Sequence, residues 1–286
     1  MNEYPRAPSS LPVPPSAVAL GNTGISVPRL AVGTGTKGWA GTSEQTRKGV
    51  AWLAGLLERA VSVGAGFWDL ADEYGSHGAA ALALRNVDRG SVVIATKTTA
   101  KDRAACSSAV DRFLGELHTN RLDIVLLHAV SSAGWNHHRR GAMTALDEAR
   151  RAGKVRAVGV SVHSLAALRT AVAEPWVDVI LVRLNHAGTE MDGPLEKVLP
   201  LVRRACAEGK GICAMKVLGC GSLASDPGRA VRFVLDTGCV HTLTIGPTCD
   251  QHLPQLVDII ARHRGPDRLT LSDRSGGRNG QAPRCS

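Results

Sequence analysis

Eight short apolar segments, each followed by a longer amphipathic segment, alternate along most of the 286-residue chain. The apolar segments have the length of buried β-strands, and the amphipathic segments have helical periodicity. Such alternation is typical of parallel strands joined by helical crossovers, and eight units close a barrel. We therefore predict an α/β protein, a (β/α)8 TIM barrel. After a first strand at residues 30–33, the predicted strands end at Asp69, Lys97, His128, Ser161, Asn185, Lys216 and Gly246.

The segment before the first strand is expected to form an N-terminal β-hairpin. Two apolar pieces flank a Gly-Asn-Thr-Gly turn at residues 21–24, and this pattern is typical of two short strands joined by a tight turn. The helices are expected at residues 44–63, 78–86, 104–117, 195–208, 227–236 and 251–262, with one more ending at Ala152 and another beginning at Leu165.

Both ends of the chain differ in composition from the barrel. Residues 1–16 are predicted to be a disordered, proline-rich leader without the pattern of a secretory signal. Residues 264–286 are predicted to be a disordered basic tail, because six arginines against two aspartates follow from Arg262 onward without apolar periodicity. The barrel domain is therefore assigned to residues 17–263.

Charge and cysteine content narrow the classes of function. The net charge of +9 lies partly in the tail and aromatic residues make up only 3%, so nucleic-acid binding is not expected. No apolar run reaches ~18 residues, so no membrane span is expected. Seven cysteines without a C-x-x-C pair indicate a reduced, cytoplasmic protein without disulfides. Cys206, Cys213 and Cys220 are evenly spaced but are expected on a helix, a strand and a loop, so no metal site is predicted.

Three consecutive predicted strands end in an ionisable side chain, namely Asp69, Lys97 and His128, and Tyr74 follows in the loop after Asp69. Each residue alone has a structural explanation, since an aspartate after a strand is often a cap or turn residue and a strand-end lysine is often solvated. In a TIM barrel, however, the active site lies at the carboxyl ends of the strands. All four side chains are therefore expected on one rim as a candidate catalytic cluster.

With these residues in place, the chain resembles the aldo-keto reductase family. Residues 67–75 are similar to the family's Asp-Thr-Ala-x-x-Tyr-Gly signature, with Leu70 in place of the usual threonine. The similarity extends over roughly residues 20–260 and keeps the family's order of motifs. The other matching segments are residues 20–35, 95–97, 123–128 and 153–161.

The resemblance implies an oxidoreductase that transfers a hydride from NAD(P)H to an aldehyde or ketone. No side chain supplies a hydride, so a nicotinamide cofactor is expected, NADP or alternatively NAD. Tyr74 would be the general acid, and Lys97 would lower the tyrosine pKa from its ordinary ~10. Asp69 would pair with Lys97, and His128 would hydrogen-bond and orient the carbonyl oxygen of a small-molecule substrate.

The resemblance also implies cofactor contacts, but this half of the site departs from the family pattern. In the family, the serine matched by Ser161 is followed by an asparagine and the next strand carries a glutamine, whereas Val162 and Leu181 stand near those places here. Met215 stands where an aromatic residue usually stacks on the nicotinamide, and its thioether can pack against a ring. The predicted cofactor-binding residues are Thr34, Asp69, Ser161, Met215, Lys216, Leu218, Gly246 and Thr248. Lys216 either contacts a pyrophosphate or is a solvated strand-end lysine, and the backbone amides near residue 246 are placed for a pyrophosphate.

Two other functions stay open. The departures at Val162, Leu181 and Met215 leave room for a catalytically weak or regulatory nucleotide-binding protein on the same barrel. An isomerase or lyase with Lys97 as a Schiff base is less well supported, because it leaves Tyr74 unexplained. The substrate, the choice between NADP and NAD, and the oligomeric state are not predicted.

Two short motifs bear on this interpretation. Residues 33–38 fit the G-x-G-x-x-G pattern of dinucleotide-binding folds, but the acidic residue expected ~20 positions later at a strand end is missing, so that fold is rejected. Residues 137–140 read His-His-Arg-Arg and are expected in the loop after His128. They either favour acidic substrates or form a solvated charge run, which is the preferred interpretation.

Overall fold

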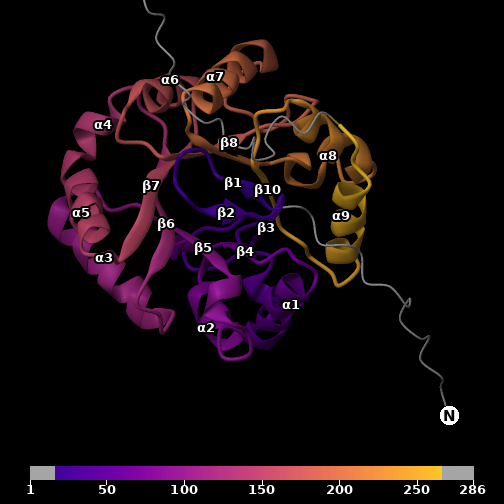
Figure 1. Ribbon diagram of the computed structural model, residues 1–286, viewed down its shortest axis with the longest axis horizontal. Helices are drawn as coiled ribbons and strands as arrows, with labels where there is room; N and C mark the ends of the chain where they lie inside the picture. The colour runs from indigo at the N-terminus through magenta and orange to yellow at the C-terminus, as the bar shows by residue number, and fades with distance from the viewer. Residues whose placement is uncertain (1–16, 266–286) are drawn as a thin grey trace, which may run out of the picture.

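The computed structural model describes residues 17–265, in which eight parallel strands close into a barrel surrounded by helices (Figure 1). Neighbouring strands pair in sequence order, and the last strand pairs with the first. The predicted TIM barrel is confirmed. In chain order the barrel strands are β3 (Leu30–Gly33), β4 (Phe67–Asp69), β5 (Val93–Thr98), β6 (Leu122–Val130), β7 (Val155–Val162), β8 (Val179–Arg183), β9 (Gly211–Met215) and β10 (Thr242–Ile245).

The helices follow the strands in the predicted order, and most of their bounds agree with the sequence pattern to within one or two residues. They are α1 (Val50–Ser62), α2 (His77–Ala83), α3 (Arg103–Glu116), α4 (Trp135–His138), α5 (Arg140–Arg151), α6 (Leu165–Ala173), α7 (Leu195–Ala207), α8 (Pro227–Asp236) and α9 (His252–Ala261). Short 3₁₀ helices occur at η1 (Thr46–Lys48), η2 (Asp72–Tyr74), η3 (Arg89–Ser91) and η4 (Gly219–Gly221).

The prediction of a single helix at residues 44–63 is wrong. Gly49 has a φ of 95°, a backbone conformation that glycine adopts without steric cost, and it separates η1 from α1. The apolar periodicity of the segment belongs to α1 alone, whose buried face includes Leu53, Leu56 and Leu57. The loop after β3 is therefore longer than predicted, and it lies at the carboxyl end of the barrel.

The prediction that residues 137–140 form a loop is also wrong. His137 and His138 lie in α4, because Trp135 at its start is buried and its indole N–H donates to the Ala167 carbonyl at 3.3 Å. The Arg139 guanidinium donates to backbone carbonyls of the loop after β5, at 2.7 Å in the case of Ala100. This basic run therefore supports the loops between the strands and helices.

The predicted hairpin is present as β1 (Val18–Ala19) and β2 (Ser26–Val27), and Figure 1 shows it across the centre of the ring of strands. Its apolar side chains, including Leu20 and Ile25, pack with inward residues near the starts of the strands, such as Phe67 of β4. Because successive strand residues point to opposite faces, these inward residues form a core separate from the one beneath the helices. The hairpin covers the amino end of the barrel and leaves the carboxyl end for a site.

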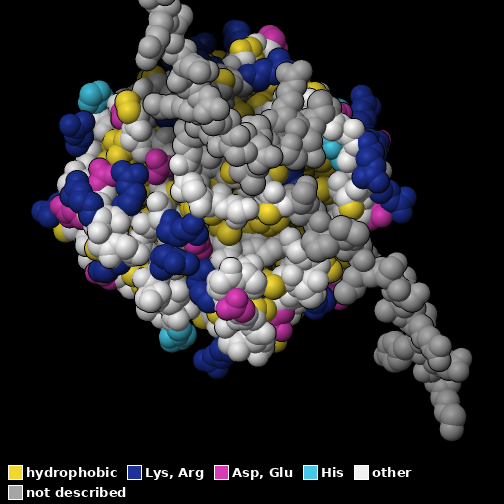
Figure 2. All heavy atoms as spheres, viewed as in Figure 1, with side chains coloured by type: hydrophobic (Ala, Val, Ile, Leu, Met, Phe, Trp, Pro, Cys, Tyr) yellow, Lys and Arg dark blue, Asp and Glu magenta, His cyan; other side chains and the backbone are white. Residues whose placement is uncertain are grey.

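Basic side chains on the face shown in Figure 2 are spread around its periphery, with acidic side chains among them. Several basic side chains of residues 17–265 form ion pairs, as in the contacts of Arg59 with Asp250 at 2.7 Å and of Arg150 with Asp178 at 2.9 Å. Within residues 17–265, no helix is long and apolar enough to cross a membrane. All six cysteines of this region are free thiols.

A buried histidine on the loop before β10 makes the stability of the barrel depend on pH. His241 is only 3% exposed, and its Nδ1 accepts a hydrogen bond from the Ile212 N–H at 3.0 Å. Burial and the nearby Arg29 charge lower the His241 pKa to about 4. Between pH 6.5 and pH 4, His241 is protonated in the unfolded chain but largely neutral in the folded chain. The free energy of unfolding therefore decreases as the pH falls through this range. We expect this one group to contribute about 3 kcal/mol to that loss.

Urea unfolding at pH 7 and at pH 4 measures this effect. The loss of unfolding free energy between the two pH values should be smaller in His241→Gln than in the wild type, whatever the stability of the variant at pH 7. The exposed His118→Gln is the matched control and should show the wild-type loss. An equal loss of unfolding free energy in His241→Gln and wild type would show that protonation of His241 does not cause the loss.

Candidate active site

The carboxyl ends of the barrel strands surround a cavity of about 530 Å³, within the size range of small-molecule sites. Inward side chains of successive strands meet at this level. Asp69 of β4, His128 of β6, Arg183 of β8 and Met215 of β9 line the cavity, together with Tyr74 from the loop after β4. Polar and ionisable groups that are far apart in sequence are thereby gathered at one end of the barrel, as predicted.

Lys97 and Asp69 form a buried ion pair at the base of this cavity. The Lys97 side chain is 0% exposed, and its Nζ donates to Asp69 Oδ1 at 2.6 Å and to the Leu70 carbonyl at 2.8 Å. Burial disfavours the ammonium, but Asp69 and Tyr74 outweigh it and hold the Lys97 pKa above its ordinary value. The structure therefore places a fixed positive charge at the base of the cavity.

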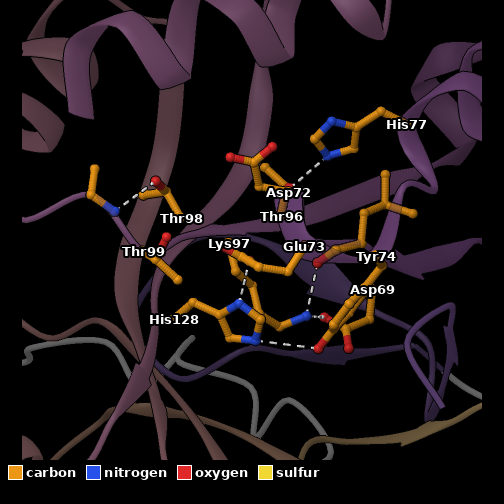
Figure 3. A network of polar contacts seen from close by, with 12 residues as sticks. Asp69, Asp72, Glu73, Tyr74, His77, Thr96, Lys97, Thr98, Thr99 and His128 are labelled. Carbon is orange, nitrogen blue, oxygen red and sulfur yellow. Dashed lines mark hydrogen bonds and ion pairs between the residues drawn. The ribbon is translucent and has the colours of Figure 1, made fainter. Parts of the chain in front are cut away.

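Tyr74 ends η2 and lies between Lys97 and His128 (Figure 3). The Lys97 Nζ is 4.8 Å from the centre of the phenol ring, and the Tyr74 Oη is 3.3 Å from His128 Nε2. A Cβ at Gly35 would lie 2.2 Å from the ring and one at Gly38 would lie 2.7 Å from it. The glycines of the G-x-G-x-x-G segment thus let the loop after β3 approach Tyr74, which explains them without a dinucleotide-binding turn.

Burial and Lys97 shift the Tyr74 pKa in opposite directions. Burial raises it, and the Lys97 charge lowers it without offsetting burial, so the net pKa lies above the ordinary 10.0. Lys97 therefore acts in the predicted direction, but the larger effect of burial was not predicted, because the sequence does not reveal how completely the phenol is buried. Tyr74 is a protonated phenol at neutral pH in this structure.

A β-bulge begins at His128, near the end of β6. Leu127 pairs with Val160 and Val130 pairs with Val162, so His128 and Ala129 together oppose one residue of β7. Ala129 has a φ of 54°, which is uncommon for a residue with a side chain and occurs often at functional sites. Alternation turns His128 inward, because Leu127 before it packs under the helices, and the bulge returns Val130 to that same outer core.

Glu73 is a site residue that sequence reasoning missed. Its Oε2 lies 2.6 Å from His128 Nδ1, on the opposite side of the imidazole from Tyr74 (Figure 3). Burial raises the Glu73 pKa, but the hydrogen bond and charge of His128 bring it below its ordinary value. Burial lowers the His128 pKa and Glu73 only partly opposes this, so His128 stays below its ordinary value. The 55-residue separation of the pair in sequence gives no signal of the contact.

A second polar network, also missed, holds the loop that carries Tyr74. Arg112 of α3 contacts Asp72 of η2 at 2.6 Å and Glu116 at 2.9 Å. Glu116 in turn contacts His77 Nδ1 at 2.6 Å, and His77 Nε2 is 2.8 Å from the Thr96 hydroxyl (Figure 3). These contacts tie η2 and α2 to α3 and β5.

The predicted cofactor residues divide into two groups. Asp69, Met215, Lys216, Leu218, Gly246 and Thr248 all line the cavity. Lys216 has a φ of 58°, and its Nζ donates to the Cys220 thiol at 3.0 Å. Lys37, which also lines the cavity, is paired with Glu44 at 2.9 Å. This part of the cavity therefore combines cationic side chains with the strand-to-helix turn at Gly246.

Thr34 and Ser161 do not line the cavity wall. Thr34 is fully buried and donates to the Asp69 carbonyl at 3.0 Å, so it braces the end of β4. Ser161 is buried on the inward face of β7, and its hydroxyl has no hydrogen-bond partner among the described residues. Val162 packs in the core beneath the helices, and Leu181 packs in the inner core. The two apolar replacements are thus accommodated by packing.

Arg183, His163 and Asp192 form a further group that sequence reasoning missed. Arg183 and His163 line the cavity, and the Arg183 Nη1 is 3.5 Å from the buried Asp192 carboxylate. Burial raises the Asp192 pKa to about 6, and burial with the Arg183 charge lowers the His163 pKa to about 4. The sequence signal for this group was Arg183, which stands two residues after Leu181 at the end of β8 and therefore points to the same face.

The sequence model of the Aldo/keto reductase family matches residues 29–256. No curated protein matches the chain in a sequence search. The family match covers most of the barrel and includes every predicted catalytic residue.

Solved structures of the same fold are numerous. A protein of Pseudomonas aeruginosa assigned to the aldo-keto reductases has 25% identity and a TM-score of 0.71, with 86% of this chain and 94% of that chain covered. An aldo-keto reductase of Bacillus halodurans in its holo form has 16% identity and a TM-score of 0.70, covering 88% and 93%. An aldo-keto reductase of Bombyx mori in complex with NADP has 19% identity and a TM-score of 0.66, covering 86% and 88%. The last two likenesses concern the fold alone.

Proposed function

This chain belongs to the aldo-keto reductase family, and we propose that it reduces an aldehyde or ketone to an alcohol with NADPH or NADH. The observation that carries the proposal is the convergence of Asp69, Tyr74, Lys97 and His128 at one cavity. Their side chains form a continuous set of contacts from the buried ion pair to the imidazole. We assign the activity to the barrel, residues 17–263, acting in the cytoplasm on a small-molecule substrate.

The residues around the cavity fit a nicotinamide cofactor, which when bound supplies the hydride that no side chain can provide. Met215 offers a polarizable surface for a ring. The Ser161 hydroxyl, on the inward face of β7, is a hydrogen-bond donor and acceptor without a partner among the described residues. Lys216 and the turn at Gly246 and Thr248 offer charge and backbone amides for phosphates. The NADP complex of the Bombyx mori relative supports NADP as the first candidate, with NAD as the second.

Tyr74 is the proposed general acid, because its hydroxyl reaches the cavity and its pKa keeps it protonated at neutral pH. Lys97 stabilises negative charge on the phenol oxygen as the proton leaves, and Asp69 holds the ammonium in place. His128 contacts the same oxygen from the other side and is placed to hydrogen-bond a carbonyl oxygen beside it. Trp39, which is 56% exposed and lies 5.9 Å from the His128 ring, offers an apolar wall for the substrate.

The charge state of Lys97 argues against a Schiff-base lyase or isomerase. A Schiff-base lysine must lose its proton to act as a nucleophile. Lys97 is fully buried, pairs with Asp69 and has a raised pKa, so it stays protonated. In the proposed reductase, by contrast, the charged Lys97 assists Tyr74 in its role as general acid.

A nucleotide titration tests the proposal most simply. We expect saturable quenching of the fluorescence of the five tryptophans by NADPH or NADH, followed by consumption of the preferred nucleotide with a panel of aldehydes and ketones. Binding without turnover on any carbonyl would favour the regulatory alternative that Val162 and Leu181 suggest. A folded protein that binds neither nucleotide at millimolar concentration would contradict the proposed function.

A further inference from the structure

Glu73 contacts His128 at the nitrogen that faces away from Tyr74, and the proposed function gives it no role. The Glu73 Oε2 to His128 Nδ1 distance is 2.6 Å, and the His128 Nε2 to Tyr74 Oη distance is 3.3 Å. The three groups therefore form a row, with the imidazole in the middle (Figure 3). The imidazole and the carboxylate are both largely buried, with side-chain exposures of 4% and 12%.

An ionised carboxylate can only accept hydrogen bonds, so His128 Nδ1 must carry the proton in this contact. A neutral His128 then has a lone pair on Nε2 and can only accept the Tyr74 hydroxyl proton. Nε2 becomes a donor toward Tyr74 or a substrate only when His128 is an imidazolium. Glu73 therefore decides which tautomer His128 adopts and favours the charged form.

We propose that Glu73 is a positioning residue that stabilises His128 as an imidazolium, so that His128 replaces the proton that Tyr74 gives to the substrate. This inference rests on the proposed carbonyl reduction. The Tyr74 O–H bond breaks as the alcohol O–H bond forms, and the His128 Nε2–H bond breaks as the Tyr74 O–H bond is restored. The hydride and its electron pair are those of the proposed reaction. His128 ends neutral, with its Nδ1–H still donated to Glu73.

The burial of Tyr74 explains why proton transfer from His128 to Tyr74 would favour the reaction. Because the Tyr74 pKa is raised, a lone phenolate in the cavity is unfavourable. A proton that arrives from His128 as the first one leaves avoids that phenolate. Lys97 supports the same oxygen electrostatically from the other side.

The charges around His128 set the direction of the expected pH dependence. Burial and the Lys97 charge lower the His128 pKa, while Glu73 and Asp69 raise it, and the net value is below the ordinary 6.5. The imidazolium is therefore a minority form at neutral pH, and the rate of reduction should rise as the pH falls. The titratable or charged groups that face His128 are Glu73 and Tyr74 of η2, Asp69 of β4, Lys97 of β5 and His163, which directly follows β7.

Glu73→Gln keeps the size and an acceptor oxygen but removes the charge. We expect NMR titration of the free protein to show the His128 pKa lowered by about one unit or more. The pH profile of kcat/KM for reduction should move to lower pH by the same amount, which lowers kcat/KM above the midpoint roughly tenfold per unit. Glu73→Asp keeps the charge and should have a pH profile of kcat/KM closer to that of the wild type. This variant also tests the inference if Glu73→Gln does not fold.

The matched control is Asp236→Asn, because Asp236 contacts His263 at 2.8 Å, and neither residue lines the cavity or belongs to the network that holds η2. This control should leave the His128 pKa and the pH profile unchanged. A His128 pKa that is equal in Glu73→Gln and wild type overturns the inference. A shifted pKa with an unmoved pH profile overturns the proton transfer. If the wild type neither binds a nucleotide nor turns over a carbonyl, the proposed function is wrong. The NMR titration of His128 would still show separately whether Glu73 raises the His128 pKa.

Discussion

Tyr74→Phe should lower kcat/KM for carbonyl reduction by roughly 10²–10⁴-fold, the range that a positioned general acid contributes. The phenylalanine ring keeps the apolar contact with Gly35 and Gly38, so the loop after β3 should stay in place. Only the hydroxyl is removed, and with it the group that contacts His128 Nε2. Steady-state kinetics with the preferred nucleotide and the best carbonyl substrate measure the loss.

Nucleotide titration of the same variant is the control. Because the ring remains, the dissociation constants for NADPH and NADH should stay within a fewfold of the wild-type values. Reduction at the wild-type rate would remove Tyr74 from the chemistry and with it the proposed roles of Lys97 and His128.

Lys97→Met should have the second large effect, on stability as well as on activity. The substitution leaves the Asp69 carboxylate buried without its partner at 2.6 Å. Breaking a buried ion pair in this way typically costs about 3–5 kcal/mol of unfolding free energy. Loss of the charge beside Tyr74 should also lower kcat/KM by roughly 10²–10³-fold, the range for one preorganised electrostatic contact in an active site.

A double variant separates these two losses. In Lys97→Met with Asp69→Leu, both charges are replaced by apolar groups, and such replacements are often neutral or stabilising. Urea unfolding should show most of the lost stability recovered, whereas the activity should stay at the level of Lys97→Met. Recovery of activity together with stability would mean that the pair serves the fold alone.

The barrel was predictable because its signals are local and repeated. Each strand is a short apolar run, each helix has a continuous apolar face, and the order of the two never changes, so even the first strand at Leu30–Gly33 was placed correctly. The exceptions depended on tertiary contacts. The burial of Trp135, which holds residues 135–138 in a helix, is set by its contact with α6 and cannot be read from the periodicity of its own segment.

The candidate site was predictable where a residue ends a strand. Asp69 and Lys97 meet because parallel neighbouring strands bring their carboxyl ends together, and this follows from topology alone. Glu73 was missed because the orientation of a loop side chain depends on the packing of η2. The raised Tyr74 pKa was missed for a related reason, since it depends on burial by the loop after β3.

The most direct test of the reductase assignment is isotope transfer. The purified protein is incubated with a carbonyl substrate and with NADPH or NADH that is deuterated at the transferable position, and the product is analysed by mass spectrometry and NMR. We predict one deuterium on the carbinol carbon of the alcohol, with formation of the labelled product reduced in Tyr74→Phe to the same extent as kcat/KM. An alcohol product without deuterium, or none from any aldehyde or ketone although the folded protein binds the nucleotide, would contradict the account.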